Sequence, residues 1–173
     1  MKLVFNVAET LFSTFDVDHG TDILIRSIDV KEPKTILDIG CGYGPIGITL
    51  AKKYPGAQVT MIDRDLLAVR YSQLNIKENN IGNAEVLGSV GLEAVANKKF
   101  DLIVSNIPAK IGDDAITQEF ILESFKHLNP NGELWLVVVN ALNHLIPKIE
   151  VLPSLKMREV RKRNGHTVYK IKK

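Results

Sequence analysis

The sequence predicts an α/β domain with a doubly wound, mostly parallel sheet. Two observations lead to this class. Short apolar runs alternate with longer helical patterns from residue 34 onward, and the chain closes on two strand-like segments joined at Asn164-Gly165. Strands that alternate with helices form a parallel sheet covered on both faces. An Asn-Gly pair between strand-like segments is a strong hairpin signal, so antiparallel pairing is expected at one edge.

Seven segments have the length and apolar content of strands. They are residues 34–39, 57–63, 84–89, 100–106, 133–140, 156–163 and 166–173. The fourth of these, FDLIVSN, is apolar enough to be buried on both faces, as parallel strands are. The tetrapeptide NPNG at 129–132 has the composition of a turn and should precede the fifth strand.

The segments between these strands have helical patterns. Residues 45–54 carry a proline near their first turn, where proline is favoured. Residues 65–80 place apolar side chains near helical spacing and run into Asn80, Ile81 and Gly82, which end the helix. A helix over 114–128 opens beside Asp113 and Asp114, which suit its positive end and are interpreted as capping residues. A helical patch at 20–28 and a broken helix at 141–152 complete the pattern.

Composition bounds the class of protein. The chain has 173 residues, of which 45% are hydrophobic and 24% charged, an ordinary balance for a single globular domain. Residues 1–173 are therefore taken as one domain, with an N-terminal helical segment over 1–33 before the sheet. No apolar run approaches the ~20 residues that cross a bilayer, and Glu9 disrupts any signal-peptide cleavage pattern. The single cysteine, Cys41, cannot form an internal disulfide, so a reducing cytoplasm is expected.

Charge is unevenly distributed along the chain. The net charge is +2, but the segment from Lys148 onward holds nine Lys or Arg residues and two acids, Glu150 and Glu159. This basic segment is interpreted first as a solvated edge hairpin, and second as a surface for a phosphate backbone. The four histidines have no metal-ligand spacing with Cys41, so no metal is expected. The oligomeric state is not predicted.

Three glycines follow the first predicted strand at alternate positions. Gly40, Gly42 and Gly44 match the pattern G-x-G-x-G and begin where the strand stops. A second frame, Gly42, Gly44 and Gly47, matches the dinucleotide fingerprint, with Asp63 lying 21 residues after Gly42. We favour the first frame because its turn starts at the end of the strand. The second frame leaves a nicotinamide-dependent oxidoreductase as an alternative.

Two carboxylates near this turn indicate the kind of ligand. Asp38 precedes the turn, and a carboxylate there suits a cationic ligand better than a pyrophosphate. S-adenosylmethionine carries an ammonium and a sulfonium and has no phosphate. Asp63 ends the second strand, where its ionised side chain can accept hydrogen bonds from both ribose hydroxyls. Ligands of such sheets bind beyond the carboxyl ends of the strands, which is where both residues are expected.

The stretch LDIGCGYGPIGITLAKKYPGAQVTMIDRD resembles the first and second motifs of class I methyltransferases. The segments LFSTFDVDHGTDILI, FDLIVSNIP, HLNPNGELWLVVVN and GHTVYKIKK resemble the small-domain methyltransferases, which include guanine-N2 methyltransferases of small-subunit ribosomal RNA. The resemblance runs from about Thr10 to the end of the chain. It implies a Rossmann-like sheet of seven strands with a reversed last strand, the class I methyltransferase fold. It also implies S-adenosylmethionine as cofactor and ribosomal RNA, or the small ribosomal subunit, as partner.

The resemblance also implies which residues hold the cofactor. The residues implied along its methionine part are Asp38, Gly40, Cys41, Gly42 and Gly44. Asp63 would hold the ribose with Arg64 beside it, Ser89 and Val90 would lie along the adenine, and Thr21 matches a position close to the cofactor. Cys41 is interpreted as a small side chain under the cofactor rather than as a nucleophile.

The turn after the fourth strand carries the substrate chemistry. In the family this turn reads Asn-Pro-Pro-aromatic, and here it reads Asn106, Ile107, Pro108, Ala109. The Asn oxygen and the next carbonyl can accept the two N–H bonds of an exocyclic amine, while the aromatic side chain stacks on an extruded base. Ile107 should fix its carbonyl less firmly than proline.

Ala109 cannot stack on a base, so another ring is needed if the acceptor is a base. Phe12 and Phe15 are the candidates, although each is more simply a core residue. The departures at 107 and 109 keep a further alternative open, namely a non-catalytic relative that binds cofactor or RNA. Methyl transfer itself needs little acid–base chemistry, because alignment of amine, methyl and sulfur can supply most of the rate.

Overall fold

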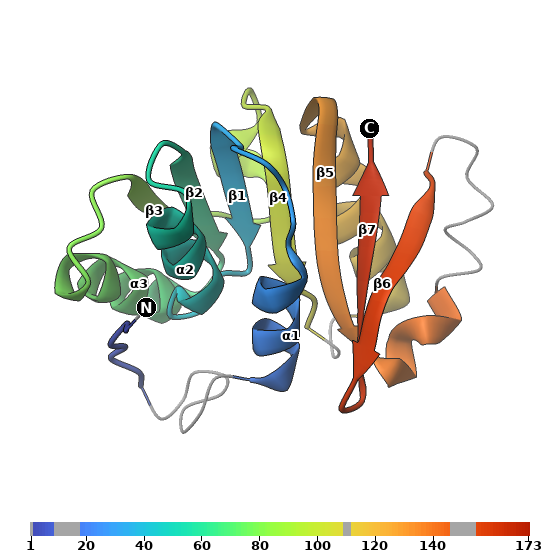
Figure 1. Cartoon of the computed structure of the whole chain (residues 1–173), viewed down its shortest axis with the longest axis horizontal. Coiled ribbons are helices and arrows are strands. Elements are labelled where there is room, and N and C mark those ends of the chain that lie inside the picture. Colours follow the sequence, from blue (N-terminus) through green and yellow to red (C-terminus); the bar gives the residue numbers. More distant parts are fainter. Residues whose placement is uncertain (1, 9–17, 109–111, 146–154) are drawn as a thin grey trace.

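The described part of the chain forms one seven-stranded sheet. The computed structural model describes residues 2–8, 18–108, 112–145 and 155–173. Their strands follow the order β3-β2-β1-β4-β5-β7-β6 (Figure 1). The parallel strands are β1 (Thr35–Ile39), β2 (Gln58–Asp63), β3 (Ala84–Gly88), β4 (Phe100–Asn106) and β5 (Leu128–Val139). The chain order reverses between β1 and β4, and this is the switch point at which ligands bind in such sheets.

The C-terminal hairpin closes one side of the sheet. β7 (His166–Lys172) runs antiparallel to β5, and β6 (Met157–Arg163) forms the edge beside it. Asn164 and Gly165 join the two strands with φ of 48° and 76°, the left-handed pair that a tight hairpin requires. The predicted fold class and its antiparallel hairpin are confirmed.

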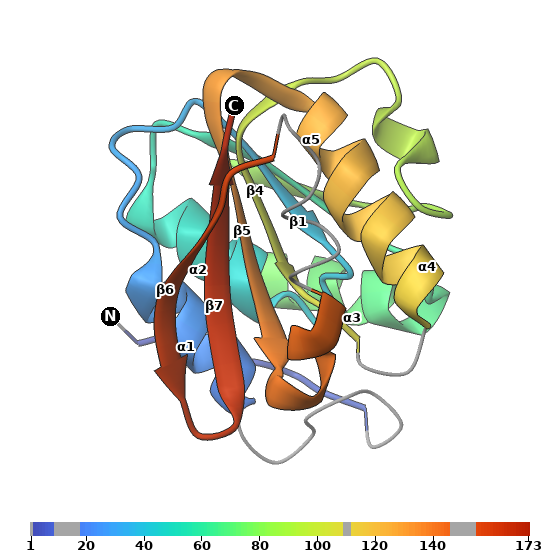
Figure 2. The same cartoon turned by 90° about the vertical axis from the view of Figure 1, so that its right-hand side faces the viewer.

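Helices cover both faces of the sheet (Figure 2). On one face lie α1 (His19–Ser27), α2 (Pro45–Lys53) and α3 (Leu66–Glu78). On the other face a continuous helical stretch comprises α4 (Asp113–Ala115), η2 (Ile116–Glu123) and α5 (Ser124–Lys126), beside the short helices η1 (Glu93–Val95) and η3 (Asn140–Leu145). No helix in the described part of the chain is long and apolar enough to cross a bilayer.

Alternation along the strands produces two apolar cores. Ile36, Leu102 and Trp135 face the α1–α2 layer, whereas Leu37 and Ile103 face the opposite helices. All five side chains are fully buried. The strands therefore cannot slip by one residue without moving apolar side chains to the wrong core, which fixes where each strand ends.

Two predicted elements differ from the structure. The helix expected over 114–128 is present, but its centre is a π-helix, because Ile116 and Ile121 are five residues apart and are both buried on the same core. The expected turn at 129–132 is instead a bulge within β5. Leu128 pairs with Phe100 before it, and Glu133 pairs with Leu102 after it.

Other boundaries lie within a few residues of the predictions. Asp113 and Asp114 occupy the first turn of α4, as expected, although the N-cap residue is Gly112 and no side chain caps the helix. Asp113 also contacts the Nε2 atom of His144 at 2.9 Å. Only the start of the broken helix expected at 141–152 can be compared, since residues 146–154 lie outside the described residues.

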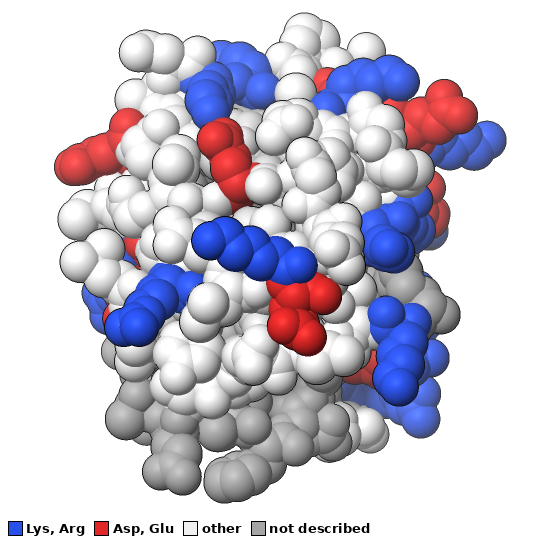
Figure 3. All heavy atoms as spheres, turned by 90° about the vertical axis from the view of Figure 1, so that its left-hand side faces the viewer, with Lys and Arg blue, Asp and Glu red and all other residues white. Residues whose placement is uncertain are grey.

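The basic segment forms the edge of the sheet, as its first interpretation predicts. Arg158, Arg161, Lys162 and Arg163 of β6 are all exposed. The opposite end of the molecule, beside β3 and α3, carries Lys, Arg, Asp and Glu side chains intermixed (Figure 3). The positive charge of the C-terminal segment is therefore concentrated on the hairpin side.

Candidate active site at the carboxyl ends of the strands

The glycine turn joins β1 to α2 and is tied to the end of β2. The main-chain N–H groups of Gly40 and Cys41 both donate to the carbonyl of Ile62, at 2.9 and 3.1 Å. Gly42 has a φ of 57°, and a Cβ built there would meet no atom within 4 Å. The turn at Gly42 therefore presents bare main chain to open space, as the first glycine frame predicts.

Asp63 links this turn to the end of β3. Its Oδ2 atom accepts the main-chain N–H of Gly42 at 2.8 Å, and its Oδ1 atom accepts that of Asp65 at 2.9 Å. Its carbonyl accepts the N–H of Ser89 at 2.9 Å. Each carboxylate oxygen keeps one acceptor position, so Asp63 can still receive two further hydrogen bonds.

Asp38 is fully buried beneath the turn. Its Oδ2 atom accepts the N–H of Gly47 at 2.8 Å, and its Oδ1 atom has no partner among the described residues. Burial raises the pKa of Asp38 to about 7, with a further increase from Asp63, while the bond from Gly47 opposes the rise. A buried carboxyl group with one unsatisfied oxygen is the arrangement expected where a positive charge is to be received.

Gly47 belongs to the second glycine frame, but packing explains it. A Cβ at this position would lie 2.3 Å from the Sδ atom of Met61 on β2. α2 therefore approaches the sheet too closely for any side chain. The residue is required for helix–strand packing whichever ligand the turn binds.

Cys41 points into the core and not toward the open side of the turn. It is 4% exposed, and its Sγ atom lies 3.7 Å from the Oγ atom of Ser72. Burial, followed by the charges of Asp38 and Asp63, raises the pKa of the Cys41 thiol well above its usual range. The thiol is neutral and cannot act as a nucleophile at ordinary pH.

The turn after β3 presents apolar surface. Val90 is 70% exposed, whereas the hydroxyl of Ser89 is occupied within its own turn, where it donates to the carbonyl of Gly91 and accepts the N–H of Ala94. Leu66 is 74% exposed, and a Cβ on Gly88 would lie 3.1 Å from its Cδ2 atom. Leu66 was not predicted as a site residue, because its place at the start of α3 looks like ordinary helix periodicity. Arg64 is exposed.

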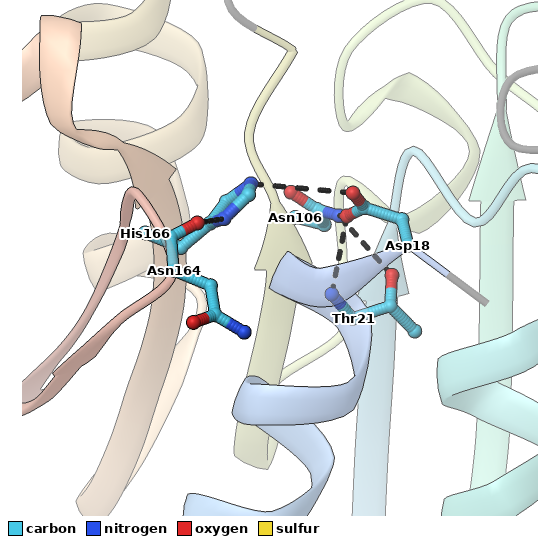
Figure 4. Close-up of polar contacts among 5 residues, drawn as sticks. All are labelled: Asp18, Thr21, Asn106, Asn164 and His166. Atoms are coloured by element: carbon cyan, nitrogen blue, oxygen red, sulfur yellow. Dashed lines mark hydrogen bonds and ion pairs between the residues drawn. The ribbon is translucent and has the colours of Figure 1, made fainter.

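Asn106 ends β4 inside a cluster of side chains from three elements (Figure 4). Its Nδ2 atom donates to the Oδ2 atom of Asp18 at 2.6 Å and to the Oγ1 atom of Thr21 at 3.1 Å. The Nε2 atom of His166, at the start of β7, lies 4.0 Å from the Oδ1 atom of Asp18. Thr21 therefore contacts the predicted substrate-orienting residue. Asp18 and His166 were not predicted, although both lie in segments that carry the family resemblance.

The main-chain N–H and the side chain of Ile107 are firmly held, although its carbonyl was expected from the sequence to be less fixed than that of a proline. Its main-chain N–H donates to the carbonyl of Val137 at 3.0 Å, and its side chain is 3% exposed. Proline could not make this hydrogen bond. Pro108 is exposed, as a residue at the mouth of a site would be. Ala109, Phe12 and Phe15 lie outside the described residues.

Comparison with known proteins decides which class of protein this chain belongs to. The model of the methyltransferase small domain matches residues 2–170. The chain belongs to the methyltransferase small domain family. The predicted resemblance is confirmed, and with it a methyltransferase that uses S-adenosylmethionine, at the level of the family. This result decides between the two glycine frames against the nicotinamide-dependent alternative.

Two relatives place the chain within this family. It is 40% identical over 130 residues to "Ribosomal RNA small subunit methyltransferase C" of Pasteurella multocida, covering 73% of this chain and 39% of that protein. It is 35% identical over 167 residues to the uncharacterized protein YbxB of Bacillus subtilis, covering 94% of this chain and 82% of that protein. The chain thus spans about two fifths of the curated methyltransferases that it matches.

Solved structures of methyltransferases share the fold. The Thermus thermophilus 16S rRNA N2 G1207 methyltransferase, solved with AdoMet and guanosine, superimposes with a TM-score of 0.85 at 26% identity, over 99% of this chain and 47% of that one. A methyltransferase from Pyrococcus furiosus superimposes with a TM-score of 0.79 at 22% identity, over 98% and 88%. Among the described residues, no group of three or more His, Cys, Asp or Glu side chains could hold a metal ion.

Proposed function

We propose that this small domain methyltransferase transfers a methyl group from S-adenosylmethionine to the exocyclic N2 amine of a guanine in small-subunit ribosomal RNA. The observation that carries the proposal is the state of Asn106. Both hydrogen bonds that its side chain makes to described residues use Nδ2, so Oδ1 remains available to accept a bond from a substrate amine. The names of the relatives from P. multocida and T. thermophilus support the choice of RNA and of guanine N2.

The residues of the glycine turn fit the cofactor. The buried Asp38 carboxyl has an unsatisfied oxygen, which suits a ligand that brings positive charge. Open main chain at Gly42 allows a flat ligand to approach, and Asp63 keeps two acceptor positions for a ribose diol. Exposed Val90 and Leu66 offer apolar surface for an adenine ring. When bound, S-adenosylmethionine supplies an electrophilic methyl group on a sulfonium.

Six other predicted residues have smaller roles in the proposed site. They are Gly40, Gly44, Cys41, Arg64, Ser89 and Thr21. The N–H groups of Gly40 and Cys41 are already bonded to Ile62, so these residues contribute shape rather than hydrogen bonds. The Ser89 hydroxyl holds the turn that presents Val90. Thr21 acts through Asn106. Gly44, with a φ of 92°, and exposed Arg64 border the turn.

The end of β4 orients the acceptor amine. An exocyclic amine has two N–H groups, and its lone pair is the nucleophile. Asn106 Oδ1 and the carbonyl of Ile107 can accept those two N–H groups and direct the lone pair away from both oxygens. The N–H of Ile107 is anchored to Val137, and the following Pro108 restricts the ψ angle that directs the Ile107 carbonyl. Pro108 then limits the conformations of the turn.

The exposed basic strand supports a nucleic acid as the acceptor. Arg158, Arg161, Lys162 and Arg163 lie together on the edge hairpin, and the turn of that hairpin places His166 beside Asp18 at the site. A phosphate backbone along β6 would therefore pass close to the end of β4. Contacts of this kind position the RNA without reading its sequence.

Transfer of labelled methyl groups tests the proposal. The protein is incubated with methyl-labelled S-adenosylmethionine and small ribosomal subunits or their RNA, and the RNA is digested to nucleosides. We expect the label in N2-methylguanosine, a large loss of it in Asn106→Ala, and no change in Asn97→Ala, an exposed asparagine elsewhere. Cofactor binding without transfer to any RNA would instead support the non-catalytic alternative.

A further inference from the structure

We propose that Asp18 is a positioning residue that fixes the side-chain amide of Asn106 with its oxygen toward the substrate. The site would thereby accept an N–H donor, such as an exocyclic amine, and disfavour a carbonyl oxygen. This inference rests on the proposed role of Asn106 as substrate orienter. It concerns a residue outside the glycine turn and outside the Asn106–Pro108 segment.

The contacts of Asp18 come mainly from hydrogen-bond donors. Its Oδ2 atom accepts the main-chain N–H of Thr21 at 3.2 Å and the Nδ2 atom of Asn106 at 2.6 Å. Its Oδ1 atom faces the Nε2 atom of His166 at 4.0 Å. The two hydrogen-bonding neighbours are donors, which suits an ionised carboxylate, a group that can only accept.

An acceptor-only neighbour removes the two-fold ambiguity of an amide. The oxygen and nitrogen of an Asn side chain are nearly equal in size, and the surrounding hydrogen bonds decide which way the amide points. If Asn106 were reversed, its Oδ1 atom would lie against the Asp18 carboxylate at the distance now occupied by Nδ2. Two acceptors at that distance repel each other, so the NH₂ group of the Asn106 amide must face Asp18.

Thr21 cannot fix the amide by itself. Its Oγ1 atom accepts from Asn106 at 3.1 Å, but a hydroxyl group can donate as readily as it accepts. With Thr21 alone, both orientations of Asn106 would find a partner. The direction therefore comes from the carboxylate, and Thr21 adds a second bond to whichever orientation Asp18 selects.

His166 and Gly20 border Asp18. The Nδ1 atom of His166 lies 2.9 Å from the carbonyl of Asn164, which can only accept, so Nδ1 carries a proton and the ring orientation is fixed. A Cβ on Gly20 would lie 2.9 Å from both Asp18 Oδ2 and His166 Cδ2, and 3.3 Å from Asn106 Nδ2. The three side chains therefore meet directly over Gly20, and a glycine is needed there.

The functional consequence is a choice between substrate groups. With Oδ1 facing outward, Asn106 offers an acceptor to an amine and no donor to a carbonyl oxygen. Guanine carries both kinds of group, on the two ring carbons that flank N1. A fixed amide therefore distinguishes its N2 amine from its O6 atom by hydrogen-bond polarity, whatever else holds the base.

Asp18 also caps α1, so the test must separate orientation from helix stability. Asp18→Asn cannot do this, because Oδ2 of Asp18 accepts both the Thr21 N–H and Asn106 Nδ2, and an amide oxygen in its place would keep both bonds. Asp18→Ser keeps a capping oxygen for the Thr21 N–H, but its side chain is shorter and its hydroxyl can donate as well as accept. Asp18→Ala removes the capping oxygen as well. Asp22→Asn is the matched control, because it removes an exposed carboxylate in the first turn of the same helix, where Asp22 pairs only with Arg26 in the described structure.

Two readouts decide the proposal. In Asp18→Ser, kcat for methyl transfer should fall on the order of 10- to 100-fold, the range for losing a hydrogen bond to a charged group. The S-adenosylmethionine Kd and the unfolding midpoint should stay near those of wild type. Asp22→Asn should leave kcat unchanged. An unchanged kcat in Asp18→Ser, or a loss explained fully by unfolding, would overturn the proposal.

The second readout does not depend on activity. The two side-chain Nδ2–H signals of Asn106, assigned by their absence in Asn106→Ala, are followed in ¹⁵N spectra of the full chain. They should be shifted by the Asp18 carboxylate in wild type and should move in Asp18→Ser but not in Asp22→Asn. Chemical shifts of these signals that do not change when Asp18 is replaced would overturn the proposal. If no RNA is methylated, the proposed function fails, while these spectra still decide the orientation of Asn106.

Discussion

The main-chain N–H of Gly42 donates to the Oδ2 atom of Asp63 at 2.8 Å, which joins the glycine turn after β1 to the carboxylate that ends β2. The two features are 21 residues apart in the sequence and were predicted to serve one ligand. Their direct hydrogen bond makes them one unit, so a change at Asp63 alters both the ribose acceptor and the shape of the turn.

Replacing Asp63 should therefore weaken cofactor binding. Asp63→Ala leaves the Gly42 N–H without its partner and removes the two free acceptor positions. We expect the Kd for S-adenosylmethionine to rise roughly 10- to 100-fold, the cost of losing hydrogen bonds to a charged group. Isothermal titration calorimetry measures it, with Asp22→Ala as an exposed control. An unchanged Kd in Asp63→Ala would exclude the residue from the cofactor site.

Asp38 should make the protein less stable as the pH rises. Its pKa is raised from 3.8 to about 7 on folding, so the folded state holds the proton more tightly than the unfolded chain. Between about pH 4 and pH 7 the folded state binds more protons, and the free energy of unfolding must fall as pH increases through that window. The effect is complete above about pH 7.

Asp38→Asn isolates this effect, because its neutral side chain keeps an oxygen for the Gly47 N–H. Relative to wild type, the variant should gain on the order of a few kcal/mol of unfolding free energy between pH 4.5 and pH 8. Urea unfolding at the two pH values measures the difference. The variant should also bind S-adenosylmethionine more weakly at pH 8. Equal differences at both pH values would show that Asp38 does not titrate in this range.

Ile107→Pro should destabilise the protein rather than restore a family feature. Proline removes the N–H that bonds Val137 and leaves space where a buried isoleucine packs. We expect a loss of about 2–4 kcal/mol, against about 1 kcal/mol for the control Ile107→Val, which keeps the N–H. Thermal unfolding measures both. Higher stability together with faster transfer in Ile107→Pro would contradict the anchoring of this turn.

Gly20→Ala separates helix preference from packing. Intrinsic helix preference alone would favour alanine by about 1 kcal/mol. The new Cβ would instead crowd Asp18 and His166, so we expect a net loss of about 1–3 kcal/mol together with reduced transfer. Gly56→Ala is the control, since a Cβ there meets nothing within 4 Å. A stabilised, fully active Gly20→Ala protein would show that the added Cβ fits without displacing Asp18 or His166.

The exposed charges of β6 should govern the salt dependence of RNA binding. If Arg161 and Lys162 each neutralise one phosphate, replacing both with Ser should reduce the slope of log Kd against log salt by roughly 1–2. Filter binding at several salt concentrations measures this slope. Lys77→Ser, on α3 at the far end of the sheet, is the control. A slope that responds equally to both changes would place the RNA elsewhere.

Much of the fold could be predicted because the signals are local. Apolar runs such as 100–106 mark buried strands, and Asn164-Gly165 specifies a tight turn by its own main-chain preferences. The bulge at 129–132 could not be predicted in this way. It looks like a turn in sequence, but Leu128 finds a pairing partner in Phe100 on the neighbouring strand, so the strand continues across it.

Local patterns predicted the glycine turn and its two carboxylates, whereas Thr21 and Asn106 were predicted only from the family resemblance. Asp38 and the glycines follow one strand, and Asp63 ends the next. Asp18, Asn106 and His166 come from α1, β4 and β7, and they meet because the sheet order places β4 near the hairpin. No spacing in the sequence encodes that meeting. The π-helix at Ile116–Glu123 was missed for a similar reason, since it follows from which side chains the core receives.

The most direct test of the central claim is nucleoside mass spectrometry of small-subunit ribosomal RNA from cells with and without the gene for this protein. Wild-type RNA should contain N2-methylguanosine at one position that is unmethylated in the deletion strain, and Asn106→Ala should not restore it. Identical N2-methylguanosine at every position in both strains would contradict the account.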